Sequence, residues 1–272
     1  MSMTPLIPAE GWHVLHLFYH IDHSQWSLFT EEEQRSAKVR LTELVQEIRA
    51  TPDTQLLTFS IVSPKADIGF MLLTPDLHVA NSFEKQLTLS LGPEILTPSY
   101  SYFSLTEPSE YTTTREQYIA ETLVAEEKLT PNTPEFEEKL VEFDKRMEHY
   151  RSHRIYPQLP DWPVVCFYPM SKRRSGSDNW YSLDYKARRE LMMGHARVGR
   201  TYSGRILQLI TGSTGLDEQE WGVTLLSKTT EDIKAIIYEM RFDEVSARYA
   251  EFGDFYICLQ LPLAELFERT CL

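Results

Sequence analysis

A short tract from Tyr168 to Arg174 places an oxidisable phenol four residues before a lysine, Lys172. This tract opens a basic segment. From Lys172 to Arg205 there are nine Lys and Arg against three acids, a net charge of +6, so the rest of the chain carries −19 (−13 minus 6). Positive charge this local indicates an anionic ligand. The segment also contains His195, a potential metal ligand, and Trp180, a second oxidisable aromatic residue.

His195 and Gln208 each have two interpretations. His195 has helical spacing with Leu191, Val198 and Tyr202, so it should face a sheet, where a lone histidine is more often a core residue than a metal ligand. Gln208 alternates with apolar neighbours on a predicted strand and shares their face. Its amide either makes a structural hydrogen bond or points at a ligand.

Tyr168 is equally ambiguous on the residues alone. Period-two alternation puts it on one strand face with Val164, Cys166 and Met170, next to the basic segment. Such a phenol is either an aromatic core residue or a group that lines a pocket.

Other candidate sites are excluded by spacing. His13, His16, His20 and His23 would share a face on a helix, but their segment has strand character, which disperses them. The glycines match neither dinucleotide nor nucleotide phosphate-loop spacing. The three cysteines form no CxxC pair, which indicates reduced thiols and no zinc site.

Composition limits the class of protein. The chain has 272 residues, 42% hydrophobic content and a pI near 5.1, enough for a sizeable core but too acidic for a nucleic-acid binder. Apolar runs are about strand length, and neither a membrane span nor a secretion signal is visible. We therefore expect a cytoplasmic protein with no nucleic-acid or membrane partner.

The periodicity predicts the same order of elements twice. Both halves follow the order βαββαβ, which is typical of ferredoxin-like units. The predicted fold is therefore α+β, with tandem ferredoxin-like units forming one antiparallel β-barrel with helices outside. In the first half we expect strands at 12–21, 56–62, 68–74 and 100–106, and helices at 30–50 and 76–91. In the second half we expect strands at 163–170, 205–211, 221–226 and 254–261, and helices at 184–202 and 230–242.

An acidic connector separates the halves. Residues 107–150 contain twelve acids and five basic residues. Apolar residues recur at helical spacing after Thr133-Pro134, and a second helix is expected at 115–129. The predicted division is an N-terminal unit at 1–111, a helical insert at 112–150 and a C-terminal ligand-binding unit at 151–272.

Several runs in the second half carry a resemblance to a known family. The chain resembles the chlorite dismutase-like superfamily and, within it, the Firmicutes-type coproheme decarboxylases. The resemblance is dense from about 154 to 255, weaker from 12 to 111 and missing over about 112–150. The runs that carry it are Tyr168 to Arg174, Asn179-Trp-Tyr181, Arg188 to Met192, Gln208 to Ser213, Glu220 to Thr224 and Tyr238 to Tyr249.

This resemblance implies a role for each site residue. His195 matches the proximal ligand of the haem iron, and Gln208 matches the distal residue, where chlorite-degrading relatives carry an arginine. Tyr168 matches the catalytic tyrosine that becomes a radical, and Lys172 matches the lysine beside the second reacting propionate. The residues expected to line the porphyrin and its propionates are Arg154, Pro169, Met170, Ser171, Trp180, Arg241 and Ser246.

The implied activity is peroxide-dependent decarboxylation. Fe-coproporphyrin III (coproheme) would serve as both substrate and redox centre, hydrogen peroxide as oxidant and haem b as product. Relatives of this type assemble as homopentamers, and coproporphyrin ferrochelatase is the expected transient partner. Two alternatives stay open: a haem enzyme with weak peroxidase or chlorite dismutase activity, and a non-enzymatic haem carrier or sensor.

Overall fold

The computed structural model describes residues 4–272. Its contacts divide the chain into two compact units: one extends to Thr106 and resumes at Leu159–Leu272, and the other is Glu107–Gln158. The larger unit contains both ferredoxin-like halves, because their strands form one sheet. The three-part division at 1–111, 112–150 and 151–272 stays a prediction about the organisation of the chain.

The first half follows the predicted order, with an additional short helix, α1. Helix α2 begins with a capping box, which the sequence Thr30-Glu31-Glu32-Glu33 predicts: Thr30 Oγ1 accepts from Glu33 N and the Glu33 carboxylate accepts from Thr30 N. Strand β4 begins earlier than predicted because Leu96 pairs with Ile21. The elements are β1 (His13–Ile21), α1 (His23–Trp26), α2 (Glu31–Ala50), β2 (Gln55–Ile61), β3 (Ile68–Thr74), α3 (Leu77–Leu89) and β4 (Leu96–Thr106).

The second half repeats this order with additional short elements. The helix predicted to reach about 242 ends at Met240, and a new helix begins at Glu244 because Asp243 caps it. The additional strand β8 pairs with the end of β5 and extends that strand to Lys172. The elements are β5 (Val164–Lys172), η2 (Gly176–Asp178), η3 (Trp180–Ser182), α6 (Tyr185–Arg200), β6 (Ile206–Gly212), β7 (Trp221–Ser227), α7 (Thr230–Met240), α8 (Glu244–Tyr249), β8 (Ala250–Phe252), β9 (Tyr256–Gln260) and α9 (Leu263–Arg269).

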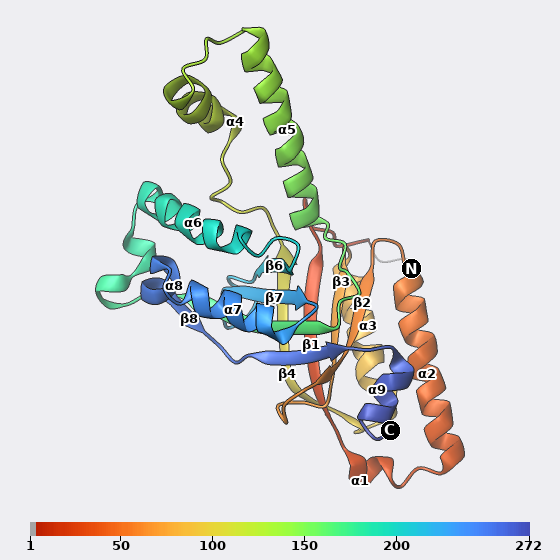
Figure 1. Ribbon diagram of the computed structural model, residues 1–272. Coiled ribbons are helices and arrows are strands. Elements are labelled where there is room, and N and C mark those ends of the chain that lie inside the picture. The colour runs from red at the N-terminus through yellow and green to blue at the C-terminus, as the bar shows by residue number, and fades with distance from the viewer. Residues whose placement is uncertain (1–3) are drawn as a thin grey trace. The chain divides into compact units, whose positions relative to one another are not determined.

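The strands confirm the predicted fold class. Each half has the ferredoxin-like strand order, β4-β1-β3-β2 in the first and β9-β5-β7-β6 in the second. Antiparallel pairing of β2 with β9 and of β4 with β6 joins the halves into a ring. The result is an antiparallel barrel with helices outside it (Figure 1).

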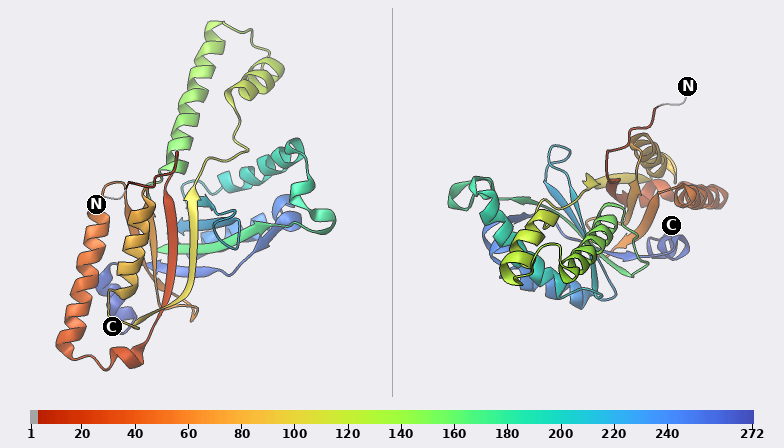
Figure 2. Two further views of the ribbon diagram at one scale, coloured as in Figure 1. Left: turned by 180° about the vertical axis from the view of Figure 1, so that it is seen from behind. Right: turned by 90° about the horizontal axis from the view of Figure 1, so that it is seen from above.

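Alternating side chains separate the barrel interior from two helix-covered outer faces. Phe18, Phe167 and Leu209 belong to the apolar cluster inside the barrel. Helices α2, α3 and α9 cover the first half, as Figures 1 and 2 show. On the second half, Cys166, Tyr168 and Ile206 pack instead with residues of α7 and with Tyr202 after α6. The functional candidates lie on this second outer face.

The connector unit contains the two helical segments that were predicted. The first consists of α4 (Arg115–Gln117) followed by the π-helix η1 (Tyr118–Glu126), and the second is α5 (Pro134–Ile155). Tyr118 stacks on Phe143 with 4.1 Å between ring centroids, and Leu123 packs on Phe136 and Leu140.

Within residues 4–272, every helix is too short or too polar to cross a membrane.

Candidate functional site

Strand β5 places Tyr168 and Lys172 on the same face, because they are four residues apart. Tyr168 is buried, and its ring stacks on Phe255 with 4.4 Å between centroids. Burial raises the pKa of Tyr168, and Arg241 opposes that shift. Within the described residues the Tyr168 hydroxyl makes no hydrogen bond. The phenol is therefore neutral at physiological pH.

Lys172 is buried, with its charge over an aromatic ring and under the influence of two acids. Its Nζ lies 4.7 Å from the ring centroid of Trp180, which is also buried. Burial lowers the pKa of Lys172 to about 8, although the charges of Asp243 and Glu220 favour the ammonium form. Lys172 is thus an ammonium group that titrates close to physiological pH.

His195 on α6 is held by a carboxylate from the loop between α7 and α8. Its Nδ1 lies 2.8 Å from Asp243 Oδ2. Burial alone would raise the pKa of Asp243, but the hydrogen bond and charge of His195, the Ser246 amide and Lys172 hold it below its usual value. Nε2 makes no hydrogen bond within residues 4–272. This arrangement orients an imidazole with its second nitrogen available as a ligand.

The sequence interpretation did not single out Asp243. It lies 48 positions from His195, so periodicity could not connect the two. The available signal was its cap position: Asp243 accepts from Ser246 N at 3.2 Å at the start of α8. The same carboxylate therefore caps a helix, orients His195 and acts on Lys172.

Gln208, which is half-buried, makes a structural hydrogen bond. Its Nε2 donates to the Gly199 carbonyl at the end of α6, at 3.2 Å. A Cβ on Gly199 would lie 3.2 Å from this nitrogen and 3.3 Å from Met240 Cε, so glycine permits the close approach. Gln208 thus contacts the helix that carries His195.

The remaining predicted contact residues fall into two groups. In the larger unit, Arg241 lies with its guanidinium 4.0 Å from the centroid of Phe252, and Ser246 is buried. Pro169, Met170 and Ser171 lie on β5, where Pro169 O accepts from Gly253 N and Met170 O from Glu220 N. Arg154 belongs to the connector unit, where its Nε donates to Glu107 O at 2.9 Å.

Several charges of the basic segment are paired within the chain. Arg173 lies 3.7 Å from Glu251, and Arg205 lies 2.9 Å from Asp232. Glu220, buried, accepts from the Lys172 amide and the Tyr181 hydroxyl, both at 2.7 Å, and lies 3.9 Å from Arg174. The net +6 therefore overstates the charge available to a ligand.

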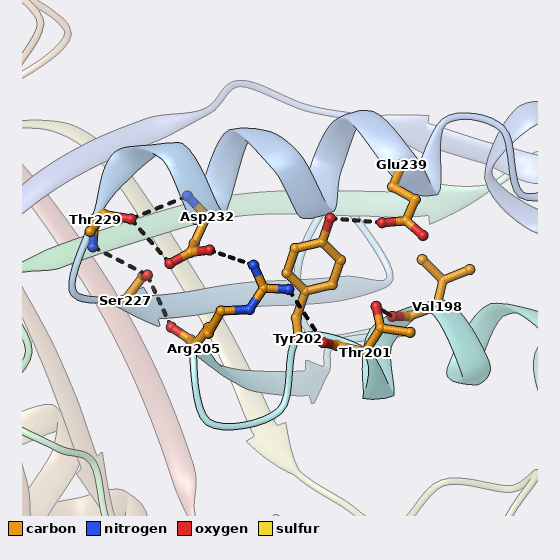
Figure 3. A network of polar contacts seen from close by, with 8 residues as sticks. All are labelled: Val198, Thr201, Tyr202, Arg205, Ser227, Thr229, Asp232 and Glu239. Atoms are coloured by element: carbon orange, nitrogen blue, oxygen red, sulfur yellow. Dashed lines mark hydrogen bonds and ion pairs between the residues drawn. The ribbon is translucent and has the colours of Figure 1, made fainter.

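Polar contacts fix the C-terminal end of α6 against α7 (Figure 3). The Tyr202 hydroxyl donates to Glu239 at 2.7 Å, and Arg205 lies over the Tyr202 ring while pairing with Asp232. Along the whole of α6, which lies inside the described chain, no residue is fully buried. These contacts, with the His195–Asp243 pair, therefore determine where the helix lies.

The donor set fits an iron porphyrin with carboxylate substituents. An imidazole whose other nitrogen is held by a carboxylate is a suitable axial ligand. Beside it, α6 and α8 line a hollow of about 510 Å³ that includes Leu191 and Asp243. Lys172 and Arg241 supply positive charge for carboxylates.

The fold and the sequence place this protein in a known class. The family model for chlorite dismutase matches residues 34–261, so the chain belongs to the chlorite dismutase family. A protein of Natronomonas pharaonis, whose name marks it as an inferred haem-binding protein, is 38% identical over 260 residues. That match covers 94% of this chain but 40% of the relative's own length.

Solved structures agree with the family. A haem-binding protein from Thermus thermophilus is 36% identical, with a TM-score of 0.80 and full coverage of both chains. A mutant chlorite dismutase from Candidatus Nitrospira defluvii has a TM-score of 0.72 at 16% identity, with 97% of each chain covered. The second likeness concerns the fold alone.

Proposed function

We propose that this protein converts Fe-coproporphyrin III to haem b by peroxide-dependent oxidative decarboxylation of the 2- and 4-propionates. One observation carries the proposal: Asp243 holds His195 through a hydrogen bond and its charge acts on the buried Lys172, whose strand face also presents Tyr168. The haem-binding names of the two relatives near 36–38% identity support a haem ligand.

Different residues would bind the iron and the propionates of the substrate. His195 Nε2 would ligate the iron, with Asp243 orienting the ring. Lys172 would face the second reacting propionate. Arg241, Ser246 and the connector residue Arg154 would anchor propionates, and arginine can engage a carboxylate through two hydrogen bonds. The remaining predicted porphyrin contacts are Pro169, Met170, Ser171 and Trp180.

When bound, the iron of the substrate supplies peroxide activation and the oxidising equivalents. Tyr168 gives up an electron and its proton, then takes a hydrogen atom from the propionate β-carbon. The carboxylate leaves as carbon dioxide when a second electron is removed, and a vinyl group remains. Per propionate, one peroxide and one proton are consumed and one carbon dioxide and two waters are formed. Burial keeps Tyr168 protonated beforehand, so its oxidation must be coupled to proton loss.

Gln208 limits how peroxide is activated. A neutral amide can hydrogen-bond but is a poor general base, so peroxide activation should be slow compared with a peroxidase. The absence of an arginine at this position also disfavours chlorite as substrate, because no guanidinium there would hold the oxyanion. A rapid peroxide reaction in stopped-flow absorbance would contradict this part of the proposal.

The test adds peroxide stepwise to protein loaded with Fe-coproporphyrin III and follows the porphyrin by mass spectrometry. Wild type should lose two carbon dioxide molecules, whereas Tyr168→Phe should retain all four propionates because phenylalanine cannot form the radical. Tyr256→Phe is the matched control, since Tyr256 is a buried tyrosine in the barrel interior. Tight binding with intact substrate in wild type would favour a haem carrier instead.

The proposed function also bears on the oligomeric state, the partner protein and the cellular location of this protein. We infer a homopentamer, because relatives of the resembled type assemble as pentamers. A cytoplasmic location and a transient contact with a coproporphyrin ferrochelatase are further parts of the proposal. Mass measurement by light scattering tests the pentamer, and a ferrochelatase pull-down tests the transient contact.

A further inference from the structure

The exposed face of α5 carries two histidines one helical turn apart, which no part of the proposed reaction uses. His149 and His153 stand at positions i and i+4, and their ring centroids lie 4.2 Å apart with an interplanar angle of 76°. Both residues are exposed, whereas Phe136, Leu140 and Phe143 on the same helix are buried. We propose that His149 and His153 form a binding site for a divalent transition-metal ion such as Zn²⁺, Ni²⁺ or Cu²⁺.

Helical spacing provides the geometry. Residues four apart lie on one face with their Cβ atoms about 5–6 Å apart, so two imidazoles can reach the same ion. Neutral imidazole is the commonest protein ligand for a metal, and it suits zinc, copper and nickel. The helix fixes the backbone positions of both histidines before an ion arrives, which reduces the entropy lost on binding.

The surroundings leave both rings available. Within residues 4–272, neither ring has a hydrogen bond or an ion pair, and the one aromatic contact of each is with the other. The nearby Arg146 lies over the rings of Tyr118 and Phe143, and Arg154 donates to Glu107 O, so both cations have partners of their own. The pair occupies the last two turns of α5, which ends at Ile155, where the helix dipole favours a cation.

The two histidines would fill only part of the coordination shell of the metal ion. The described residues contain no group of three His, Cys, Asp or Glu that could hold a metal, so water or a second molecule would supply the remaining ligands. The ion would tie together two turns of α5, the second of which also carries Arg154. This site is separate in sequence and residue set from His195, so the inference stands without the proposed function.

Titration of tag-free, haem-free protein with Ni²⁺, followed by calorimetry, tests the site. Wild type should bind one ion per chain, and His149→Gln or His153→Gln should weaken binding about a hundredfold, because the second ligand acts at high effective concentration only when the first is bound. Restoring the spacing with Lys145→His in the His153→Gln background should recover most of the affinity. His23→Gln removes an exposed histidine elsewhere and should change nothing.

The variants also separate chelation from general surface binding. Equal loss in His23→Gln and His149→Gln, or wild-type affinity no higher than that of the double variant His149→Gln/His153→Gln, would overturn the proposal. Circular dichroism of each variant without metal checks that α5 is intact. Porphyrin binding by the same variants should be unchanged, which keeps this result independent of the decarboxylase test.

Discussion

At the scale of single residues, Asp243 links the groups on which the proposed chemistry depends. It accepts a hydrogen bond from His195, caps α8 through Ser246 and stabilises the charge of Lys172. An amide in its place could still cap α8, but it would lose the negative charge that acts on His195 and Lys172.

Replacing Asp243 by asparagine should weaken binding of Fe-coproporphyrin III about tenfold to a hundredfold, because groups that orient a ligating histidine have effects of that size. Absorbance titration measures the affinity. Asp53→Asn is the control, since Asp53 is exposed in the turn before β2, in the first half of the barrel. Equal affinity in Asp243→Asn and wild type would show that His195 needs no carboxylate.

Lys172 should make stability depend on pH above neutrality. Its pKa is about 8 in the folded protein, against an ordinary value of 10.5, because the ammonium is buried. The unfolded chain therefore binds the proton more tightly, and the buried charge destabilises the fold by up to about 3 kcal/mol at neutral pH. That cost falls away as the pH rises from about 8 to 10.5.

Urea denaturation of wild type and Lys172→Met at pH 7 and pH 10 measures this effect. Relative to the variant, wild type should gain stability at the higher pH. Lys186→Met, an exposed lysine of α6, serves as the comparison and should show no such change. If wild type instead loses stability relative to Lys172→Met from pH 7 to pH 10, the prediction is wrong.

At the scale of elements, α6 is held by polar contacts at defined points instead of by a buried apolar face. Asp184 caps its start by accepting from Ala187 N, Asp243 holds its middle through His195, and Tyr202 and Arg205 hold the segment after its end. The position of the candidate iron ligand should therefore be sensitive to the network in Figure 3.

Removing the Tyr202 hydroxyl with Tyr202→Phe should lower the free energy of unfolding by about 1–2 kcal/mol, because the hydrogen bond to the Glu239 carboxylate is lost. Urea denaturation measures the change. Tyr238→Phe is the matched control, since Tyr238 on α7 is exposed. An equal decrease in the free energy of unfolding in the two variants would show that the Tyr202–Glu239 hydrogen bond does not stabilise the protein.

At the scale of the whole molecule, the strands of the barrel differ in how much of their length is paired with neighbouring strands. Strand β5 is flanked along its length, by β7 on one edge and by β9 and β8 on the other. Within the described residues, strand β6 is paired with β7 throughout, but with β4 only through Thr211 and Gly212. Tyr168 and Lys172 thus lie on the better-supported strand, and Gln208 on the less supported one.

Hydrogen exchange followed by mass spectrometry should reveal this difference. Amides of 164–170 should exchange more slowly than those of 206–210, because the second set has an edge without a paired strand along most of its length. The measurement is made on protein without haem, so ligand protection does not contribute. Slower exchange in 206–210 would contradict the uneven pairing.

The sequence by itself determined the order of the elements and most of their positions. Caps such as Thr30 and Asp76 and the largely apolar runs of β1 and β5 are local properties, so they can be recognised without knowing any contact. The duplicated βαββαβ order then gave the fold class, and the resemblance supplied the candidate roles of Tyr168, His195 and Gln208.

Only the tertiary structure decided which distant groups meet. The pairing of His195 with Asp243, the burial of Lys172 beside Trp180 and the neutralisation of Arg173 and Arg205 join residues from different elements. Periodicity reports which face a side chain takes, but not which element covers that face. The short elements α8 and β8 were missed for the same reason, since they depend on the Asp243 cap and on pairing with β5.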